Sequence, residues 1–345
     1  MSGQGRSRVA MLIAPRRIEL RDEPVPTASP GGIVVRVRAA LTDGTDLKAY
    51  RRGHPQMPMP TRFGHEFSGD VASVGSGVTE LRAGDAVMCA HSAPCGRCFW
   101  CGNAQEELCE SVMSTMILGA YADYVEVPAH IVARNCFVKP RDVSYPQAAF
   151  LEPLACVVHS AAFLAPTPGA TVAILGDGGF GILHALLLKH DGRNAILVGR
   201  RPERLELARE LGIETVDTRS TPAREALHAR TGGRGADAAI ECTGSLEVWE
   251  DAPALVRRGG MVSFFGGLPA EARVSFAAAR LHYDQIRLIS PFHFAPRDVR
   301  RAHDLIVAHA IPLLPLLSHA YALGDVATAF ARLDAAEGMK VLIEP

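Results

Sequence analysis

The sequence predicts a chain of two domains, an all-β domain followed by an α/β domain with a parallel sheet. Two patterns support this fold class. Short apolar or alternating segments, bounded by Gly, Pro and Asp, fill residues 1 to about 155 and are typical of a barrel or a sandwich. From about His159 onward, strand candidates alternate with helical segments, as parallel strands joined by helices require. With 345 residues, 48% of them hydrophobic, the chain can bury the cores of two domains.

The first domain is expected to begin with a strand at Val9–Ala14. This apolar run is too short for the core of a secretory signal, and the chain has no run of about 18 apolar residues, so we expect a cytoplasmic protein without a membrane span. Turn signals rich in Gly and Pro separate the next candidates. The further strands are expected at Ile33–Ala39, Val71–Val74, Ala86–Ala90 and Tyr121–Val127.

In the second domain, a helix is expected over Pro202–Leu211, with Pro in its first turn and Gly212 directly after its end. The other expected elements are strands at Glu214–Val216, Asp237–Cys242 and Met261–Phe265, and helices around Pro222–Arg230 and Leu246–Val256. The last stretch, from about 293 to 345, carries a helix near Arg297–His309 and a strand at Lys340–Ile343. We expect this stretch to fold back onto the first domain.

The clearest motif is a glycine-rich turn within Thr171–Arg201. An apolar run over Val172–Leu175 leads into G-x-G-x-x-G, and an apolar helical segment and a second apolar run follow. In this context the glycines allow a tight turn and a close approach of the backbone to a pyrophosphate, which the helix N-terminus then binds. The turn therefore predicts a dinucleotide site, and not merely an ordinary strand-to-helix connection.

Four of the eight cysteines, Cys95, Cys98, Cys101 and Cys109, lie close together with the spacing C-x2-C-x2-C-x7-C. Four thiolates on one short segment match a closed tetrahedral zinc site, whose role is structural because no position is left for a substrate. Binding of the ion would contribute on the order of 10 kcal/mol to ordering this segment. Disulfides, free thiols and an iron–sulfur cluster are the alternatives.

The other cysteines and the overall charge point to an ordinary globular protein. Cys89, Cys136, Cys156 and Cys242 are scattered, and we interpret them as small core residues. The chain has 36 basic and 37 acidic residues, so its composition gives no sign of a nucleic acid or an anionic membrane as partner.

Four motifs in order resemble those of the zinc-containing medium-chain dehydrogenases, with the sorbitol, polyol and threonine dehydrogenase-like members as the nearest relatives. They are the cysteine quartet, GHEFSG (64–69), LEPLACVVH (151–159) and GDGGFG (176–181). The resemblance implies a chaperonin-10-like barrel as catalytic domain over 1–157, with a zinc lobe at about 93–112. It also implies a Rossmann domain with a doubly wound parallel sheet over 158–292, and a return of 293–345 to the catalytic domain. The active site would lie in the cleft between the domains. Homodimers or homotetramers would form through the Rossmann edge, near Met261–Phe265.

The resemblance also implies a catalytic metal. The histidine ligand of the family corresponds to His65, and Glu66 binds the metal or stands just behind it. Glu152, before Pro-Leu, lies beside the metal or binds it directly. One imidazole and carboxylates, with a position left for water or an alcohol oxygen, suit a catalytic zinc ion. Taken singly, each of these residues also fits an ordinary packing or helix-start role.

The chain departs from the family at the first ligand. Where the family has Cys-Gly-Ser/Thr-Asp-x-His, this chain has Asp43-Gly44-Thr45-Asp46-Leu47-Lys48. A carboxylate at Asp43 is a harder ligand than a thiolate, so the site would bind zinc more weakly, accept another divalent ion, or have lost its metal.

Thr45 and Asp46 match the family in this segment, whereas Lys48 stands where many members have a relay histidine. Thr45 matches the hydroxyl that binds the substrate oxygen and passes on its proton, and Asp46 matches the acid that orients His65. Lys48 is an outer proton relay, a cation facing the cofactor, or a solvated surface lysine.

The form of the cofactor is predicted from the end of the second strand, where a carboxylate holds the ribose hydroxyls of NAD. Gly199 stands there, followed by Arg200 and Arg201. The missing carboxylate removes a repulsion toward a 2′-phosphate, and a guanidinium binds that phosphate or stacks on adenine. Gly-Arg-Arg-Pro resembles the NADP-preferring members, so we expect NADP(H); the alternative is a solvated turn with another acid binding NAD. The expected cofactor-binding residues are Gly176, Gly178, Gly179, Phe180, Gly181, Gly199, Arg200, Arg201 and Thr243.

The sequence therefore predicts an NADP-dependent zinc alcohol dehydrogenase that interconverts a secondary alcohol or polyol-like substrate and its ketone. Asp43 motivates a second hypothesis, an NADPH-dependent reductase of activated C=C or C=O bonds that lacks a catalytic metal. A third hypothesis is a non-catalytic NADP-binding protein.

Overall fold

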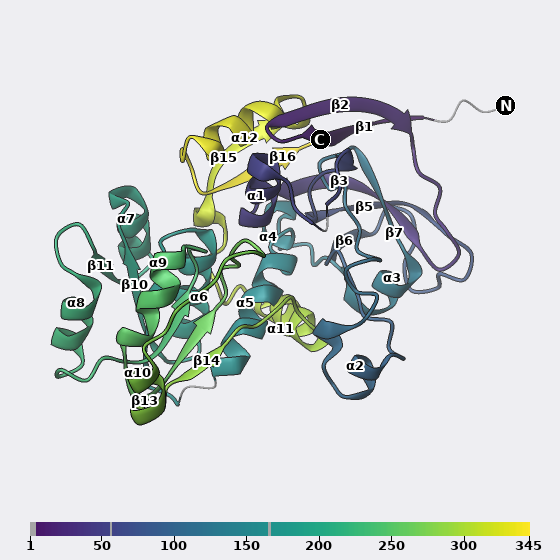
Figure 1. Ribbon diagram of the computed structural model, residues 1–345. Helices are drawn as coiled ribbons and strands as arrows, with labels where there is room; N and C mark the ends of the chain where they lie inside the picture. Colours follow the sequence, from purple (N-terminus) through teal and green to yellow (C-terminus); the bar gives the residue numbers. More distant parts are fainter. Residues whose placement is uncertain (1–4, 56, 165–166) are drawn as a thin grey trace. The chain divides into compact units, whose positions relative to one another are not determined.

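The computed structural model describes residues 5–55, 57–164 and 167–345 (Figure 1). The chain forms two compact units. The first consists of 1–155, 294–309 and 313–345, and the second of 156–293 and 310–312. Residues 294–309 and 313–345 thus belong to the same compact unit as residues 1–155. One segment, Tyr145–Leu164, is long and apolar enough to cross a membrane, but 78% of it is buried, as in the core helix of a soluble protein.

Two sheets form the first unit. In the larger sheet the strands follow the order β15-β16-β3-β5-β6-β8, with β7 pairing with β3, and the smaller sheet has the order β2-β1-β4. The strands of the first sheet are β3 (Ile33–Leu41), β5 (Glu66–Val74), β6 (Ala86–Cys89), β7 (Tyr124–Val127), β8 (Cys136–Val138), β15 (Leu317–Ala322) and β16 (Lys340–Glu344). Those of the second are β1 (Arg6–Ala14), β2 (Arg17–Pro24) and β4 (Thr61–Arg62).

Helices and 3-10 turns accompany these strands, and one of the helices, α5 (Leu151–Leu164), continues along the chain into the second unit. The helices are α1 (Gly44–Arg52), α2 (Phe99–Gly102), α3 (Ala129–Asn135), α4 (Tyr145–Ala148), α5, α11 (Pro296–Val307) and α12 (Val326–Asp334), with 3-10 turns η1 (Glu106–Leu108), η3 (Leu314–Leu316) and η4 (Leu323–Asp325). The sequence does not predict helices α1, α2, α3, α4 and α12 of this unit, nor strands β2, β4, β8 and β15. Helix α1 is the most important of these elements. It carries the expected catalytic residues Thr45, Asp46 and Lys48, and a fourth, Asp43, is its N-terminal cap.

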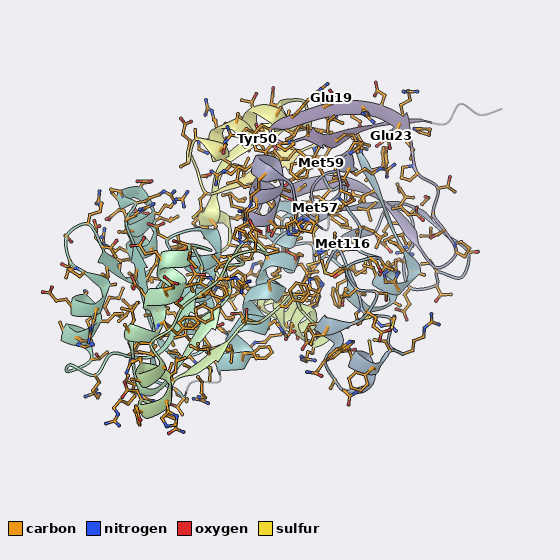
Figure 2. All side chains as sticks on the ribbon, viewed as in Figure 1. Glu19, Glu23, Tyr50, Met57, Met59 and Met116 are labelled. Atoms are coloured by element: carbon orange, nitrogen blue, oxygen red, sulfur yellow. The ribbon has the colours of Figure 1, made fainter. Side chains whose placement is uncertain are left out.

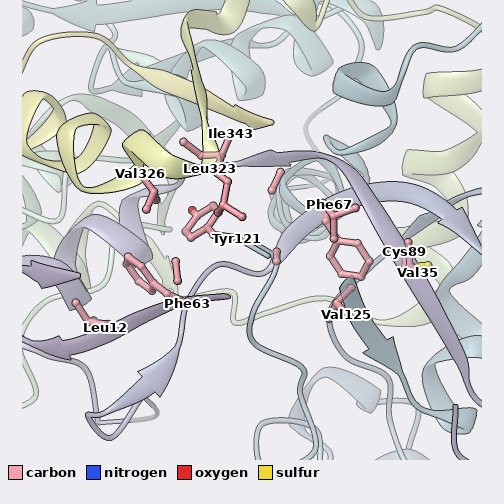
Figure 3. Packing of buried hydrophobic residues seen from close by; sticks show 14 of the residues in the cluster. Leu12, Val35, Phe63, Phe67, Cys89, Tyr121, Val125, Leu323, Val326 and Ile343 are labelled. Atoms are coloured by element: carbon pink, nitrogen blue, oxygen red, sulfur yellow. The ribbon is translucent and has the colours of Figure 1, made fainter. Parts of the chain in front are cut away.

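The core of the first unit joins residues from both ends of the chain (Figure 3). Phe63 and Tyr121 pack edge to face with ring centroids 5.4 Å apart, and Phe330 of α12 lies 4.8 Å from Phe63. Tyr50 and Met57 extend this core, and Met59 and Met116 pack against it while half-buried (Figure 2). A fully buried aromatic or aliphatic side chain stabilises a fold by about 1.5–3 kcal/mol. Because Phe330 is fully buried in this core, helix α12 contributes to the stability of the first unit.

The second unit contains one six-stranded parallel sheet with the order β11-β10-β9-β12-β13-β14. Numbered along the chain, this order is 3-2-1-4-5-6, and it reverses between the first and fourth strands, where ligands bind in such sheets. The strands are β9 (Thr171–Leu175), β10 (Asn194–Gly199), β11 (Glu214–Asp217), β12 (Ala236–Glu241), β13 (Val256–Phe264) and β14 (Arg287–Ile289). The helices are α6 (Gly179–His190), α7 (Pro202–Glu210), α8 (Ala223–Arg230), α9 (Leu246–Asp251) and α10 (Ala278–Tyr283), with the 3-10 turn η2 (Ala252–Ala254).

The predicted strands and helices of this unit are confirmed, with two corrections. The helix expected over Leu246–Val256 ends at Asp251, and Val256 already belongs to strand β13. Strand β14, which the pattern did not reveal, pairs with β13 through Met261↔Arg287. The edge of the sheet on this side is therefore strand β14, and not the segment Met261–Phe265.

Candidate functional site

Asp43 occupies the turn between β3 and α1. Its backbone is extended (φ −135°), and its Oδ1 accepts a hydrogen bond from the N–H of Asp46 at 2.7 Å, which caps helix α1. Asp and Asn are preferred helix caps because one side-chain oxygen satisfies an otherwise unpaired N–H. The other oxygen, Oδ2, lies 3.7 Å from Nε2 of His65. One carboxylate thus caps the helix and faces the imidazole.

His65 is held from its other side by Asp46. The Nδ1 of His65 lies 3.1 Å from Oδ1 of Asp46, which is fully buried and also accepts a hydrogen bond from the hydroxyl of Tyr121. A ring whose Nδ1–H donates to a carboxylate presents Nε2 as a metal ligand, as in carboxylate–histidine–zinc sites. Gly64, before His65, has φ +87°, and a Cβ there would lie 2.8 Å from the Tyr121 ring. The turn that delivers His65 therefore requires glycine.

Glu66 has a partner of its own. The ammonium group of Lys340, in β16, lies 2.6 Å and 2.8 Å from the two carboxylate oxygens of Glu66, and it also donates to the carbonyl of Thr42 at 2.9 Å. Both members of this pair are buried. The Lys340 ammonium thus compensates the charge of Glu66, whose carboxylate also belongs to one group with His65 and Glu152. Lys340 was not recognised from the sequence because it lies 274 residues away from Glu66.

Glu152 lies on the first turn of α5, next to a second histidine. The Oε1 of Glu152 is 3.4 Å from Nδ1 of His91, and both side chains are buried. The His91 ring packs edge to face against His65, with centroids 4.9 Å apart, and against Phe294 at 5.8 Å. His91 follows β6 and was also missed, because the sequence gives it no motif.

These residues form two overlapping groups whose ligand atoms lie within 4.8 Å of one another. One group is Asp43, Asp46 and His65, and the other is His65, Glu66 and Glu152. Thr45 and Lys48 lie half-buried on α1, the helix that Asp43 caps. The expected catalytic residues are therefore gathered around His65, with Thr45 and Lys48 on the adjoining helix.

The charges of this cluster favour a cation. Four carboxylates, those of Asp43, Asp46, Glu66 and Glu152, face one lysine and His65. Burial raises the pKa of Asp43, and it raises the pKa of Glu66 well above the usual range. Burial by itself lowers the pKa of His65, but Asp46 and Asp43 raise it well above its usual range. Four buried carboxylates are unfavourable unless positive charge compensates them. A divalent cation bound to these oxygen and nitrogen atoms would supply that charge.

The cysteine quartet forms a second possible metal site. The four sulfur atoms lie within 4.8 Å of one another, with 3.5 Å between Cys98 and Cys101 and 4.0 Å between Cys95 and Cys101. In a tetrahedron with Zn–S bonds of about 2.3 Å, the sulfurs are about 3.8 Å apart. The N–H of Cys95 donates to the sulfur of Cys109 at 3.2 Å, as backbone groups do around metal-bound thiolates. The spacing fits a zinc ion.

The interpretation of the other four cysteines as core residues was correct for only one of them. Cys89 is buried, whereas Cys136, Cys156 and Cys242 are half-buried. Cys89 and Cys136 face each other across β6 and β8, with 2.8 Å between their sulfur atoms.

The glycine-rich turn has the geometry expected for a pyrophosphate. Gly176 ends β9 with φ +120°, and a Cβ there would lie 2.9 Å from the side chain of Thr243. A Cβ on Gly181 would lie 1.9 Å from the carbonyl oxygen of Gly176, so the third glycine lets α6 pack against the turn. Gly178 caps α6, and nothing lies within 4 Å of its Cβ position, which leaves the helix N-terminus open. Gly179 and Phe180 begin the helix, and the Phe180 ring lies 5.0 Å from Phe265.

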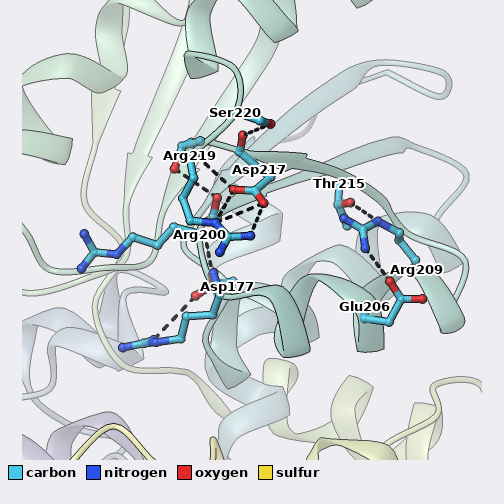
Figure 4. A network of polar contacts seen from close by, with 11 residues as sticks. Asp177, Arg200, Glu206, Arg209, Thr215, Asp217, Arg219 and Ser220 are labelled. Carbon is cyan, nitrogen blue, oxygen red and sulfur yellow. Dashed lines mark hydrogen bonds and ion pairs between the residues drawn. The ribbon is translucent and has the colours of Figure 1, made fainter.

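The end of β10 differs from the expectation. Gly199 and Arg200 are at the predicted place, but the space beside them holds the carboxylate of Asp177, the second residue of the glycine turn (Figure 4). The N–H groups of Arg200 and Arg201 both donate to Oδ2 of Asp177, at 2.7 Å and 2.8 Å. The sequence alone indicates no role for Asp177, because the glycine motif leaves that position unspecified.

Comparisons with known proteins cover nearly the whole chain. Residues 29–137 match the family model of the alcohol dehydrogenase GroES-like domain, and residues 179–308 match that of zinc-binding dehydrogenases. A sorbitol dehydrogenase of Halalkalibacterium halodurans is 28% identical over 334 residues, covering 94% of this chain and 95% of that protein. An L-threonine 3-dehydrogenase of Streptomyces avermitilis is 30% identical over 335 residues, with the same coverage.

A solved structure is also similar along its full length. It comes from Sinorhizobium meliloti, is named for a zinc-binding dehydrogenase, and was solved with bound NADP. It superposes with a TM-score of 0.91 at 30% identity, covering 99% of this chain and 100% of that one.

Proposed function

The chain belongs to the zinc-containing medium-chain dehydrogenase/reductase family of oxidoreductases acting on CH–OH groups, and from that premise we propose an NADP(H)-dependent alcohol dehydrogenase. Its substrate pair would be a secondary alcohol or polyol-like molecule and the corresponding ketone. The observation that carries the proposal is His65, which Asp46 orients so that Nε2 faces Asp43, and which also belongs to a second group with Glu66 and Glu152.

The catalytic metal would be held by His65, Asp43 and Glu152. When bound, zinc supplies a Lewis acid that polarises the substrate oxygen. Asp46 fixes the orientation and tautomer of His65, and Lys340 holds Glu66 behind it, so these two residues position the ligands. Thr45, half-buried on α1, would hold the hydroxyl proton of the substrate, and Lys48 on the next turn would relay that proton outward.

The cofactor proposal is NADP(H), held by the glycine turn and the end of β10. When bound, its nicotinamide supplies or accepts the hydride. Gly176, Gly178 and Gly181 let the backbone approach the pyrophosphate, while Thr243 packs beside the first of them. Arg200 is exposed and Arg201 is half-buried directly after Gly199, a placement suited to a 2′-phosphate. The NADP bound to the Sinorhizobium meliloti protein is consistent with this choice.

We also propose a structural zinc ion on the four cysteines, a cytoplasmic location, and a homodimer or homotetramer. The quartet has no histidine or carboxylate among its sulfurs, as is usual for closed zinc sites. Assembly would use the edge strand β14, since an unpaired strand edge is a ready partner for a second copy.

A second candidate function is a reductase of activated C=C or C=O bonds that has no catalytic metal. Asp43 favours this candidate function. A proton bound to its buried carboxyl group, or to His65, would compensate the negative charge of the cluster without a metal ion.

Metal content and turnover distinguish the two candidates. The purified protein is analysed by inductively coupled plasma mass spectrometry with and without NADPH, and assayed over a panel of secondary alcohols, polyols and ketones. About two zinc ions per chain with alcohol oxidation support the dehydrogenase. About one ion, with reduction of activated double bonds only, supports the reductase. Tight NADPH binding without any hydride transfer would refute both candidates.

A further inference from the structure

The carboxylate of Asp177 fills the space beside Gly199 at the end of β10. A Cβ on Gly199 would lie 2.5 Å from Oδ2 of Asp177 and 2.6 Å from its Cβ. Contacts below about 3 Å are not tolerated by packed atoms, so a residue larger than glycine cannot stand at 199 while Asp177 is in this position. The two positions are coupled, because the glycine of the strand makes room for the acid of the turn.

Asp177 is held in place by the backbone that begins helix α7. Its Oδ2 accepts the N–H groups of Arg200 and Arg201, and its Oδ1 lies 3.7 Å from the guanidinium of Arg201 and 4.0 Å from that of Arg204. The side chain is only 7% exposed. Two successive backbone N–H groups that point at one oxygen, here directly before α7, form an anion-binding arrangement that suits a phosphate oxygen as well as a carboxylate. Asp177 therefore occupies an anion-binding position of the protein itself.

This position is also where the cofactor's adenosine ribose is recognised. In doubly wound sheets, an acid at the end of the second strand binds the ribose hydroxyls of NAD, whereas an arginine accommodates the 2′-phosphate of NADP. Strand β10 is the second strand of this sheet and ends at Gly199 without an acid. Asp177 brings a carboxylate to the same strand end from the first turn instead. The absence of an acid at 199 therefore does not mean that the space is clear of negative charge.

We propose that Asp177 is a specificity-determining residue of the cofactor site. Its carboxylate binds the adenosine ribose in place of an acid at the strand end, and the protein therefore accepts NAD(H) as well as NADP(H). The inference rests on the dinucleotide site of the proposed function. Arg200, Arg201 and Arg204 attract a 2′-phosphate, while Asp177 repels it and accepts a hydrogen bond from a ribose hydroxyl. The preference for NADP(H) is thus limited by Asp177 rather than set by the arginines alone.

A purely structural role, the capping of two N–H groups, predicts a different outcome from a role in recognition. Asp177→Asn keeps an oxygen that accepts both N–H groups but removes the negative charge. The matched control is Asp217→Asn. Asp217 ends the neighbouring strand β11, directly opposite Gly199, but its carboxylate is paired with Arg219 and does not contact the N–H groups of Arg200 and Arg201 (Figure 4).

The experiment measures dissociation constants of the full-length protein and its variants for adenosine 2′-monophosphate and adenosine 5′-monophosphate by calorimetry, and for NADPH and NADH by fluorescence. For Asp177→Asn we expect the affinity ratio to shift about tenfold or more toward the 2′-phosphate, while Asp217→Asn changes it by less than about twofold. An Asp177→Asn ratio within twofold of wild type overturns the proposal.

A double variant tests whether the effect of changing Asp177 comes from misfolding of this turn. In Asp177→Gly/Gly199→Asp the acid returns to the strand end, where the removal of the Asp177 side chain has made room for it. We expect a ratio within about threefold of wild type, whereas Asp177→Gly alone favours the 2′-phosphate. A double variant that behaves like Asp177→Gly overturns the proposal. If wild type binds none of the four nucleotides, the proposed dinucleotide site itself is wrong, which is a separate result.

Discussion

The Nδ1 of His65 lies 3.1 Å from Oδ1 of Asp46, and both groups are buried. This contact decides which nitrogen of the imidazole faces Asp43, and it links the turn that carries His65, directly before β5, to the helix that Asp43 caps. The candidate catalytic centre is therefore organised by an acid that would not itself touch a metal ion. Its substitution is the most direct test of that organisation.

Asp46→Asn is expected to weaken zinc binding about 10- to 100-fold, because the amide cannot stabilise the His65 orientation as the carboxylate does. The dissociation constant is measured by competition with a chromophoric chelator. Asp123→Asn serves as control, since Asp123 pairs with Arg8 away from this cluster. Unchanged zinc affinity in Asp46→Asn would show that the contact is not a support for a metal ligand.

Three substitutions at Asp43 separate its two roles. Asp43→Ser keeps a helix cap but removes the carboxylate, so we expect a folded protein with about one zinc ion fewer per chain. Asp43→Ala loses the cap as well, at a cost of about 1 kcal/mol. Asp43→Cys should retain the metal, and its cobalt form should gain a thiolate charge-transfer band. Full metal content in Asp43→Ser would remove Asp43 from the ligand set.

Lys340→Met leaves Glu66 buried without its partner and is expected to destabilise the protein by about 3–5 kcal/mol. The double variant Glu66→Gln/Lys340→Met should regain most of that stability, because the uncompensated charge is gone. Thermal unfolding of the metal-free and zinc-loaded forms provides the measurement. If the single and double variants melt together, the ion pair is not the reason for the loss.

Removal of the proposed structural zinc should loosen one segment only. Cys98→Ser is expected to lose one equivalent of metal and to make residues 93–112 susceptible to limited proteolysis, since binding of the ion orders the lobe. Cys156→Ser, outside the quartet, is the control. Equal protease resistance in both variants would argue against a metal on the quartet.

His184 makes the second unit sensitive to acid. Burial lowers the pKa of this histidine to about 4, while its Nδ1 donates to the carbonyl of Phe180 at 2.8 Å. Because the unfolded chain takes up a proton near pH 6.5 and the folded one only near pH 4, stability falls as the pH drops through this window, by up to about 3 kcal/mol. In His184→Leu the melting temperature should depend less steeply on pH over the same range. Identical slopes would mean that other groups govern the acid response.

Local patterns could be predicted from the sequence, and distant pairings could not. The glycine turn and the cysteine quartet are each complete within about thirty residues, so spacing alone indicates their chemistry. Lys340 and His91 contact Glu66 and Glu152 from separate strands or loops, and no periodicity connects those positions. Asp177 lies inside the recognised motif, but its target is 23 residues further on, so its role depends on the parallel pairing of β9 and β10.

Lys340 follows the whole second unit in the sequence although it belongs to the first, and this has a consequence for synthesis on the ribosome. The second unit is nearly continuous over 156–293 and can fold as soon as that stretch has emerged. The first unit lacks α12, strands β15 and β16, and the Lys340 ammonium until the residues that follow the second unit have been synthesised. We expect the order of folding to reverse the order of the sequence, with residues 1–155 staying protease-sensitive in stalled nascent chains until strand β16 has emerged.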